Sequence, residues 1–200
     1  MKTNLRTSTR FNVKAGAVLA LAASLWLTGC VVTSIYPFYQ AKDLTFDSAL
    51  LGLWQDAKED STDKESWAFE KLDERTYKLI TADGEKKNEF DAHLFKLKGA
   101  LFLDLLSRER PDNAAPLHFL LRVDAFAPRL ELRLLKYDWL TKLVETNPAA
   151  IRHTIVPKKS GAGEGGDLVL TADTEELQKF VEQHLATTNA WSDKVLLQKR

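Results

Sequence analysis

The segment SWAFEKLDERTYKLITADG, residues 66–84, contains two stretches in which apolar and polar residues alternate. Trp67 and Phe69 share one face of the first stretch, and Tyr77 lies on the equivalent face of the second. Alternation of this kind is typical of antiparallel strands with one buried face. The dipeptide Asp83-Gly84 follows, and it is a strong hairpin signal because both residues tolerate positive φ. The segment therefore predicts a chain that folds back on itself in successive hairpins.

The same pattern extends in both directions from this segment. Short apolar or alternating stretches, separated by polar or Gly- and Pro-containing turns, occupy residues 52–57, 88–98, 100–106, 117–126, 130–137, 151–157, 167–171 and 194–199. We predict a mainly β fold, in which an antiparallel meander of about nine or ten strands closes into a barrel. Closure is favoured because it removes exposed strand edges.

Two helices are predicted in the second half of the chain. A short helix near residues 138–147 has Asp138 as its expected N-cap and ends at an Asn-Pro pair. A longer helix near residues 174–186 begins after Asp173, which forms a capping-box pattern with Glu176.

The composition is that of a globular protein. The 200 residues are 44% hydrophobic and include 28 basic and 28 acidic side chains, which excludes disordered and collagen-like classes. The one cysteine is Cys30, so no internal disulfide can form and a disulfide scaffold is also excluded. Stability must therefore come from a hydrophobic core.

The first 27 residues have the pattern of a secretory signal peptide. Residues 1–14 carry four basic side chains and no acidic one, and an apolar run follows at residues 15–27. That run is shorter than the roughly 20 residues needed by a membrane-spanning helix. Cleavage is the favoured interpretation.

Directly after the apolar run, Leu27-Thr28-Gly29-Cys30 resembles the lipobox of bacterial lipoproteins. The resemblance implies that the Cys30 thiol receives a diacylglyceryl group, that the Gly29–Cys30 bond is cut, and that the new amino terminus is acylated. Two or more acyl chains anchor a protein stably to a bilayer. Val31, in place of Asp, is similar to lipoproteins sent on to the outer membrane. An ordinary secretory peptide with a cysteine near its cleavage site is the alternative.

These features divide the chain into a signal peptide at residues 1–29, a lipidated tether at residues 30–48 and a barrel domain at residues 49–200. The expected location is the bacterial cell envelope, with the protein anchored in the outer membrane and facing the periplasm. Without its four leader cations, the chain keeps 24 basic and 28 acidic residues. This acidic balance makes nucleic acid an unexpected partner.

The tripeptide Gly52-Leu53-Trp54, at the entry to the first predicted strand, resembles the G-x-W signature of lipocalin-like barrels. A helix and one further strand after the meander fit the same pattern. The resemblance implies that Gly52 and Trp54 close the base of the barrel, and that Lys199 or Arg200 stacks on the Trp54 ring.

The sequence contains no recognisable catalytic motif, so we predict that the protein is not an enzyme. The four histidines, His93, His118, His153 and His184, lack metal-ligand spacing, and we expect neither a metal nor a cofactor. Asp91 and His93 share one strand face, where a solvated pair is favoured over an acid/base pair.

We predict a non-enzymatic binding module for an apolar or amphipathic small molecule. Its candidate ligand-lining residues are Trp67, Phe69, Tyr77, Phe90, Arg122 and Arg133. Asp104 interrupts an apolar strand, and the two arginines could supply its counter-charge or line a cavity for an anionic headgroup. The alternative function is a structural lipoprotein with a packed core that docks onto another envelope protein, with Trp139 and Leu143 on the candidate contact face.

Overall fold

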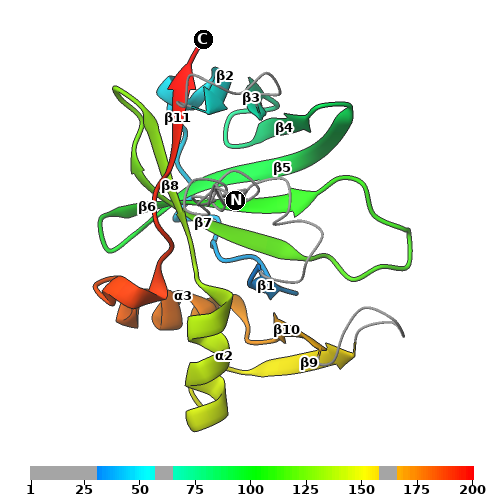
Figure 1. Ribbon diagram of the computed structural model, residues 1–200, viewed down its shortest axis with the longest axis vertical. Coiled ribbons are helices and arrows are strands. Elements are labelled where there is room, and N and C mark those ends of the chain that lie inside the picture. Colours follow the sequence, from blue (N-terminus) through cyan, green and yellow to red (C-terminus); the bar gives the residue numbers. More distant parts are fainter. Residues whose placement is uncertain (1–30, 57–64, 158–165) are drawn as a thin grey trace, which may run out of the picture.

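A computed structural model of the protein describes residues 31–56, 65–157 and 166–200 (Figure 1). Eight strands of this part form a closed antiparallel barrel, and strand β11 closes it by pairing with both β2 and β8. The barrel strands are β2 (Gly52–Asp56), β3 (Ser66–Lys71), β4 (Tyr77–Asp83), β5 (Lys86–Leu97), β6 (Ala100–Ser107), β7 (His118–Ala125), β8 (Leu130–Leu134) and β11 (Val195–Lys199). The predicted antiparallel meander barrel is confirmed.

The expected nine or ten barrel strands are too many, because three described strands lie outside the barrel. They are β1 (Thr33–Ser34), β9 (His153–Pro157) and β10 (Gly166–Leu170). Strand β7 uses one half of its edge for β8 and the other half, at His118 and Phe119, for β1. Strand β1 then pairs with β10, and β10 with β9. The stretches predicted at residues 151–157 and 167–171 therefore form the antiparallel pair β9 and β10, but this pair extends the sheet below the barrel.

Both predicted helices exist, with different boundaries. Helix α2 spans Tyr137–Thr146, and its N-cap is Lys136, which makes no side-chain cap bond; Asp138 lies in the first turn and is not the cap. Helix α3 spans Thr174–Gln183, so it ends three residues before the predicted 186 and is no longer than α2. Asp173 caps it as expected, by accepting a hydrogen bond from the Glu176 N–H at 3.0 Å.

Two short 3₁₀ helices, η1 (Ser48–Leu50) and η2 (Thr188–Ala190), complete the described elements. Among the described residues, no helix combines the length and the hydrophobicity needed to cross a membrane.

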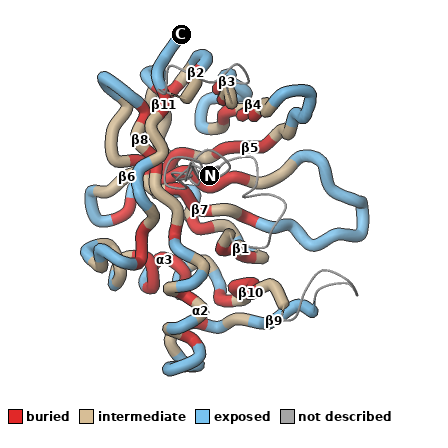
Figure 2. Tube along the Cα trace, viewed as in Figure 1, coloured by how far each residue is buried: buried red, intermediate tan, exposed pale blue. Residues whose placement is uncertain are grey.

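The buried side chains form two hydrophobic cores, one on each side of strands β5, β6 and β7. Figure 2 shows buried residues along the barrel strands and again at β10 below them. The barrel core fills the inside with alternate residues such as Leu103 and Leu105. The lower core lies on the outer face of the same strands, where Phe95 and Phe102 belong to one cluster with side chains from α2, α3 and β10. Because both of its faces are covered, β6 is apolar at six of its eight positions, unlike a strand with one solvated face.

The segment 35–45, here called the N-terminal strap, lies against the outside of the barrel. Its Leu44 pairs with Phe95 at the edge of β5, and the backbone of Lys96 donates to the Asp43 carbonyl. Phe38 is buried in the lower core, whereas Tyr36 is exposed. The described part of the predicted tether is thus packed onto the barrel domain.

Candidate functional site

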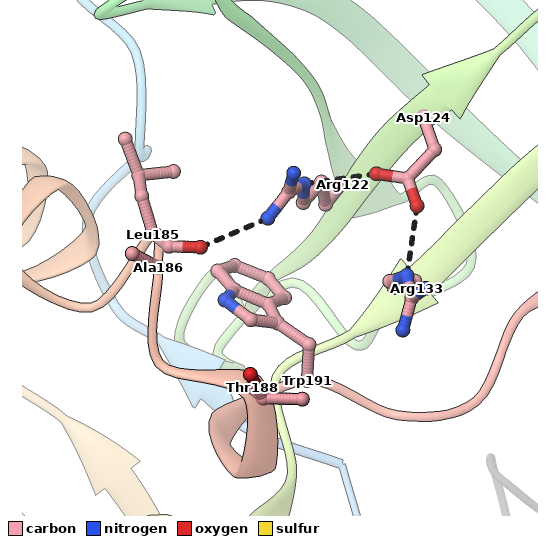
Figure 3. A pocket seen from close by; sticks show the side chains of 7 residues that line it. All are labelled: Arg122, Asp124, Arg133, Leu185, Ala186, Thr188 and Trp191. Carbon is pink, nitrogen blue, oxygen red and sulfur yellow. Dashed lines mark hydrogen bonds and ion pairs between the residues drawn. The ribbon is translucent and has the colours of Figure 1, made fainter.

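A cleft of about 180 Å³ lies on the outer wall of the barrel, where the segment after α3 crosses strands β7 and β8 (Figure 3). Its lining residues are Arg122, Asp124, Arg133, Leu185, Ala186, Thr188 and Trp191. The two arginines come from the barrel wall, and the apolar side chains come from the crossing segment. The cleft therefore combines cationic groups with an aromatic surface.

Strand pairing brings the two arginines together, because Arg122 on β7 lies directly opposite Arg133 on β8. Like charges at such a position repel. Asp124 relieves the repulsion: its Oδ1 lies 2.9 Å from Nε of Arg122, and its Oδ2 accepts from Nε of Arg133 at 2.7 Å. The β7–β8 register shifts between Val123 and Ala125, so Asp124 sits at a β-bulge. Bulges reorient side chains at such irregular positions.

Each guanidinium also holds the crossing segment through one backbone carbonyl. Nη1 of Arg122 donates to the Leu185 carbonyl at 3.0 Å, and Nη1 of Arg133 donates to the Ser192 carbonyl at 2.9 Å. An arginine side chain has five N–H donors. Within the described ranges, the structure gives neither Nη2 group a protein acceptor. Both arginines are about a quarter exposed, so these donors remain available to a ligand.

Trp191 forms the aromatic wall of the cleft. The Cζ atom of Arg122 lies 5.7 Å from the centroid of the Trp191 ring, a cation–π distance (Figure 3). The indole Nε1 donates to the His184 carbonyl at 3.0 Å, and the ring packs near Phe102 in the lower core. The ring is therefore held in one orientation before any ligand binds.

The other four predicted ligand-lining residues lie elsewhere. Trp67, Phe69, Tyr77 and Phe90 belong to the barrel core and are between 0 and 5% exposed. Phe69 makes an edge-to-face contact with Tyr77, at a centroid distance of 6.3 Å. These rings pack against their neighbours inside the barrel. The structure thus separates the predicted set into two groups, and Arg122 and Arg133 are the two that line the cleft.

Sequence reasoning missed Asp124 and Trp191. Asp124 could have been found, because it follows Arg122 by two positions and therefore shares its strand face. No comparable signal marks Trp191, which lies outside any strand or helix and reaches the cleft only through the tertiary fold.

Asp104 lies on the outer barrel face and is fully buried under the N-terminal strap. The N–H of Phe38 donates to its Oδ2 at 2.9 Å, and Nδ1 of His118 lies 2.7 Å from its Oδ1. The idea that Arg122 or Arg133 supplies its counter-charge is wrong, because both arginines pair with Asp124. Asp104 therefore attaches the strap to the barrel.

A second polar group under the strap contains His93 and Tyr39. The two rings stack at a centroid distance of 4.5 Å. Burial lowers the pKa of His93, which keeps its imidazole neutral near neutral pH. Burial and then the charges of Asp104 and Asp91 raise the pKa of Tyr39 to about 12. Oδ1 of Asp91 lies 3.6 Å from Nη1 of Arg108, so Asp91 forms an ion pair with this arginine, whereas the His93 ring stacks on Tyr39.

The remaining predicted positions are those of the G-x-W tripeptide and the lipobox. Nζ of Lys199 lies 5.2 Å from the Trp54 ring, in agreement with the expected stacking. Gly52 has φ +117°, which side-chain-bearing residues rarely adopt. The role of Gly52 and Trp54 in closing the barrel base stays a prediction. Gly29 and Cys30 lie outside the described residues.

In the part of the chain that the structure describes, no group of three or more His, Cys, Asp or Glu side chains could hold a metal ion.

The fold and cleft define a protein of the eight-stranded antiparallel β-barrel class, with a second core below the barrel. No family model matches the chain, no curated protein matches it, and no solved structure matches it.

Proposed function

We propose that this protein is a lipid-anchored lipoprotein of the bacterial cell envelope that acts as a non-enzymatic binding module for an amphipathic small molecule. The observation that carries the binding role is the cleft at Arg122, Arg133 and Trp191. Concave sites with an apolar surface and a few placed polar groups are typical of ligand binding. Trp67, Phe69, Tyr77 and Phe90 are buried in the barrel core, which favours this outer cleft over the lumen as the ligand site.

The proposed location depends on the lipobox-like Leu27-Thr28-Gly29-Cys30 and on Val31. Acyl chains on Cys30 would be the membrane contact, in the outer membrane with the domain facing the periplasm. The lipocalin-like Gly52 and Trp54 pattern supports a relationship to ligand-carrying barrels, although a fold alone does not define a function.

We expect a Cys30→Ser variant to lose lipid attachment completely, because serine has no thiol to accept the diacylglyceryl group. Cells grown with radiolabelled palmitate should label the wild-type protein, and its mass should correspond to a chain that begins at Cys30 and carries acyl groups. The variant should remain unlabelled and uncut. A Thr3→Ser control, which leaves the lipobox intact, should behave as wild type. Equal labelling of wild type and Cys30→Ser would contradict the proposed anchor.

We expect the acylated protein purified from cells to carry a small molecule, which native mass spectrometry detects as mass beyond that of the acylated polypeptide. Acid denaturation should remove this extra mass. An Arg122→Gln variant should retain less of it, whereas the control Arg129→Gln, in the exposed β7–β8 turn, should retain all of it. Identical native and denatured masses would contradict the binding role.

The second candidate is a lipoprotein that docks onto another envelope protein. Strand β9 favours it, since β9 lies at the edge of the described sheet with Ile155 and Val156 about half exposed. Edge strands with apolar side chains pair readily with other chains. Trp139 and Leu143, the contact residues expected from sequence, instead pack against the lower core.

A further inference from the structure

The charge and size of the cleft narrow the ligand class, and this step rests on the proposed binding role. We infer that the cleft holds an oxyanion, such as a phosphodiester or carboxylate group with one negative charge, between Arg122 and Arg133. The shared chemistry covers both an anionic lipid headgroup and a free small anion.

The first argument is the charge balance. Two guanidinium groups and one carboxylate line the cleft, which leaves one positive charge unmatched among its lining residues. Guanidinium remains protonated in proteins, so this charge does not depend on pH in the physiological range. A singly charged anion would neutralise the cleft, whereas a cation would be repelled.

The second argument is the arrangement of donors. Asp124 accepts a hydrogen bond from Nε of Arg133 and forms an ion pair with Nε of Arg122. The Leu185 and Ser192 carbonyls each accept one hydrogen bond from an Nη1 group. Within the described residues the Nη2 groups have no protein acceptor, so both arginines keep donors for a ligand. An oxyanion has several acceptor oxygens and can bridge two such groups, and charge-assisted bonds of this kind are about twice as strong as neutral ones.

The structure also explains why these arginines are ready to bind. Both are held by a carboxylate and by a backbone carbonyl, so their side chains lose little further freedom when a ligand arrives. Such preorganisation raises affinity because the ordering cost is met by the fold. The Trp191 ring, fixed through its own hydrogen bond, offers an apolar surface beside the anion.

The third argument is size. A cleft of about 180 Å³ is smaller than the roughly 300–1,000 Å³ typical of sites that enclose a whole drug-sized ligand. It has room for an oxyanion group and a few adjoining atoms. The apolar part of an amphipathic ligand would therefore extend along the outside of the barrel wall.

The test is a titration of the full chain, in neutral detergent, with inorganic phosphate and with acetate. NMR signals of the arginine Nε–H and tryptophan Nε1–H groups are followed at constant ionic strength, with chloride as the reference salt. We expect saturable shifts for Arg122, Arg133 and Trp191 with phosphate or acetate. Equal or non-saturating shifts in chloride would overturn the inference.

The matched variants are Arg133→Gln and Arg129→Gln, which remove the same charge inside and outside the cleft. Arg133→Gln should weaken anion binding by about tenfold, the loss expected for one charge-assisted hydrogen bond, and Arg129→Gln should bind as wild type. If the glutamine variant unfolds, anion affinity is measured instead for Arg133→Lys, which keeps the positive charge but loses the planar guanidinium group. Equal affinity in all variants would overturn the inference.

A further experiment with lipid vesicles distinguishes an anionic lipid headgroup from a free small anion as the ligand. If the anion belongs to a lipid headgroup, phosphatidylglycerol vesicles should shift the cleft signals, and phosphatidylcholine vesicles should not. If phosphate or acetate binds but neither vesicle acts, the ligand is a free anion. If native mass spectrometry detects a bound small molecule but neither phosphate nor acetate binds, the proposed binding role is retained and the oxyanion inference is refuted. If the protein binds the anion but incorporates no radiolabelled palmitate, only the proposed lipid anchor is refuted.

Discussion

An Asp104→Ala variant is expected to lose about 2–6 kcal/mol of the free energy of unfolding. The carboxylate of Asp104 is 0% exposed and accepts from Phe38 N–H and from His118. Removing it leaves two buried donors without an acceptor, and each such donor costs about 1–3 kcal/mol. The lost bond at Phe38 also frees the N-terminal strap from the barrel wall. Urea denaturation, monitored by tryptophan fluorescence, measures this loss of free energy of unfolding.

Two further variants make this expectation specific. Asp104→Asn keeps one acceptor oxygen, so its loss should be about half that of the alanine variant. Asp112→Asn, on the exposed β6–β7 loop, should change stability by no more than about 0.5 kcal/mol. If Asp104→Ala proved as stable as Asp112→Asn, the hydrogen bonds of Asp104 to Phe38 and His118 would contribute nothing to the free energy of unfolding.

A Phe69→Ala variant is expected to lose about 3–5 kcal/mol, the usual cost of truncating a buried aromatic side chain. Phe69 is 2% exposed and lies between Trp67 and Tyr77 in the barrel core. Its removal takes away apolar burial and leaves a cavity that its neighbours can fill only in part. Thermal or urea unfolding of the variant measures the loss.

Leu72→Ala is the matched control, since Leu72 follows the same strand but is 47% exposed. Its loss should stay within about 0.5 kcal/mol. A small apolar compound such as benzene should bind and stabilise Phe69→Ala but not wild type, because a dry engineered cavity accepts apolar ligands. A wild-type protein that benzene stabilises equally would indicate an open lumen and would reopen the barrel interior as the ligand site.

The individual strands and hairpins could be predicted because their signals are local. Alternation placed Trp67 and Phe69 on the buried face of β3, as the structure has them, and the turn at Gly84 joins β4 to β5. Asp173 and Glu176 correctly located the start of α3. The end of α3 was placed too late, because His184 and Leu185 extend its apolar stripe while the helix already ends at Gln183.

The candidate site was predicted only in part. Arg122 and Arg133 were recognised as a cationic pair on neighbouring strands, and their register places them opposite each other. Trp191 is distant in sequence from both, and nothing near it in the chain indicates a cleft. Asp104 was recognised as unusual, but its partner His118 comes from the next strand and its second contact, Phe38, comes from the strap.

Local sequence thus accounts for which residues become strands, where the chain turns and which side of a strand is apolar, because each depends on neighbours a few positions away. The number of strands in the barrel depends on how β7 divides its edge between β8 and β1. The cleft depends on where the segment after α3 crosses the barrel wall. Both features arise from contacts between residues far apart in the chain, and these contacts form only when the two cores pack together.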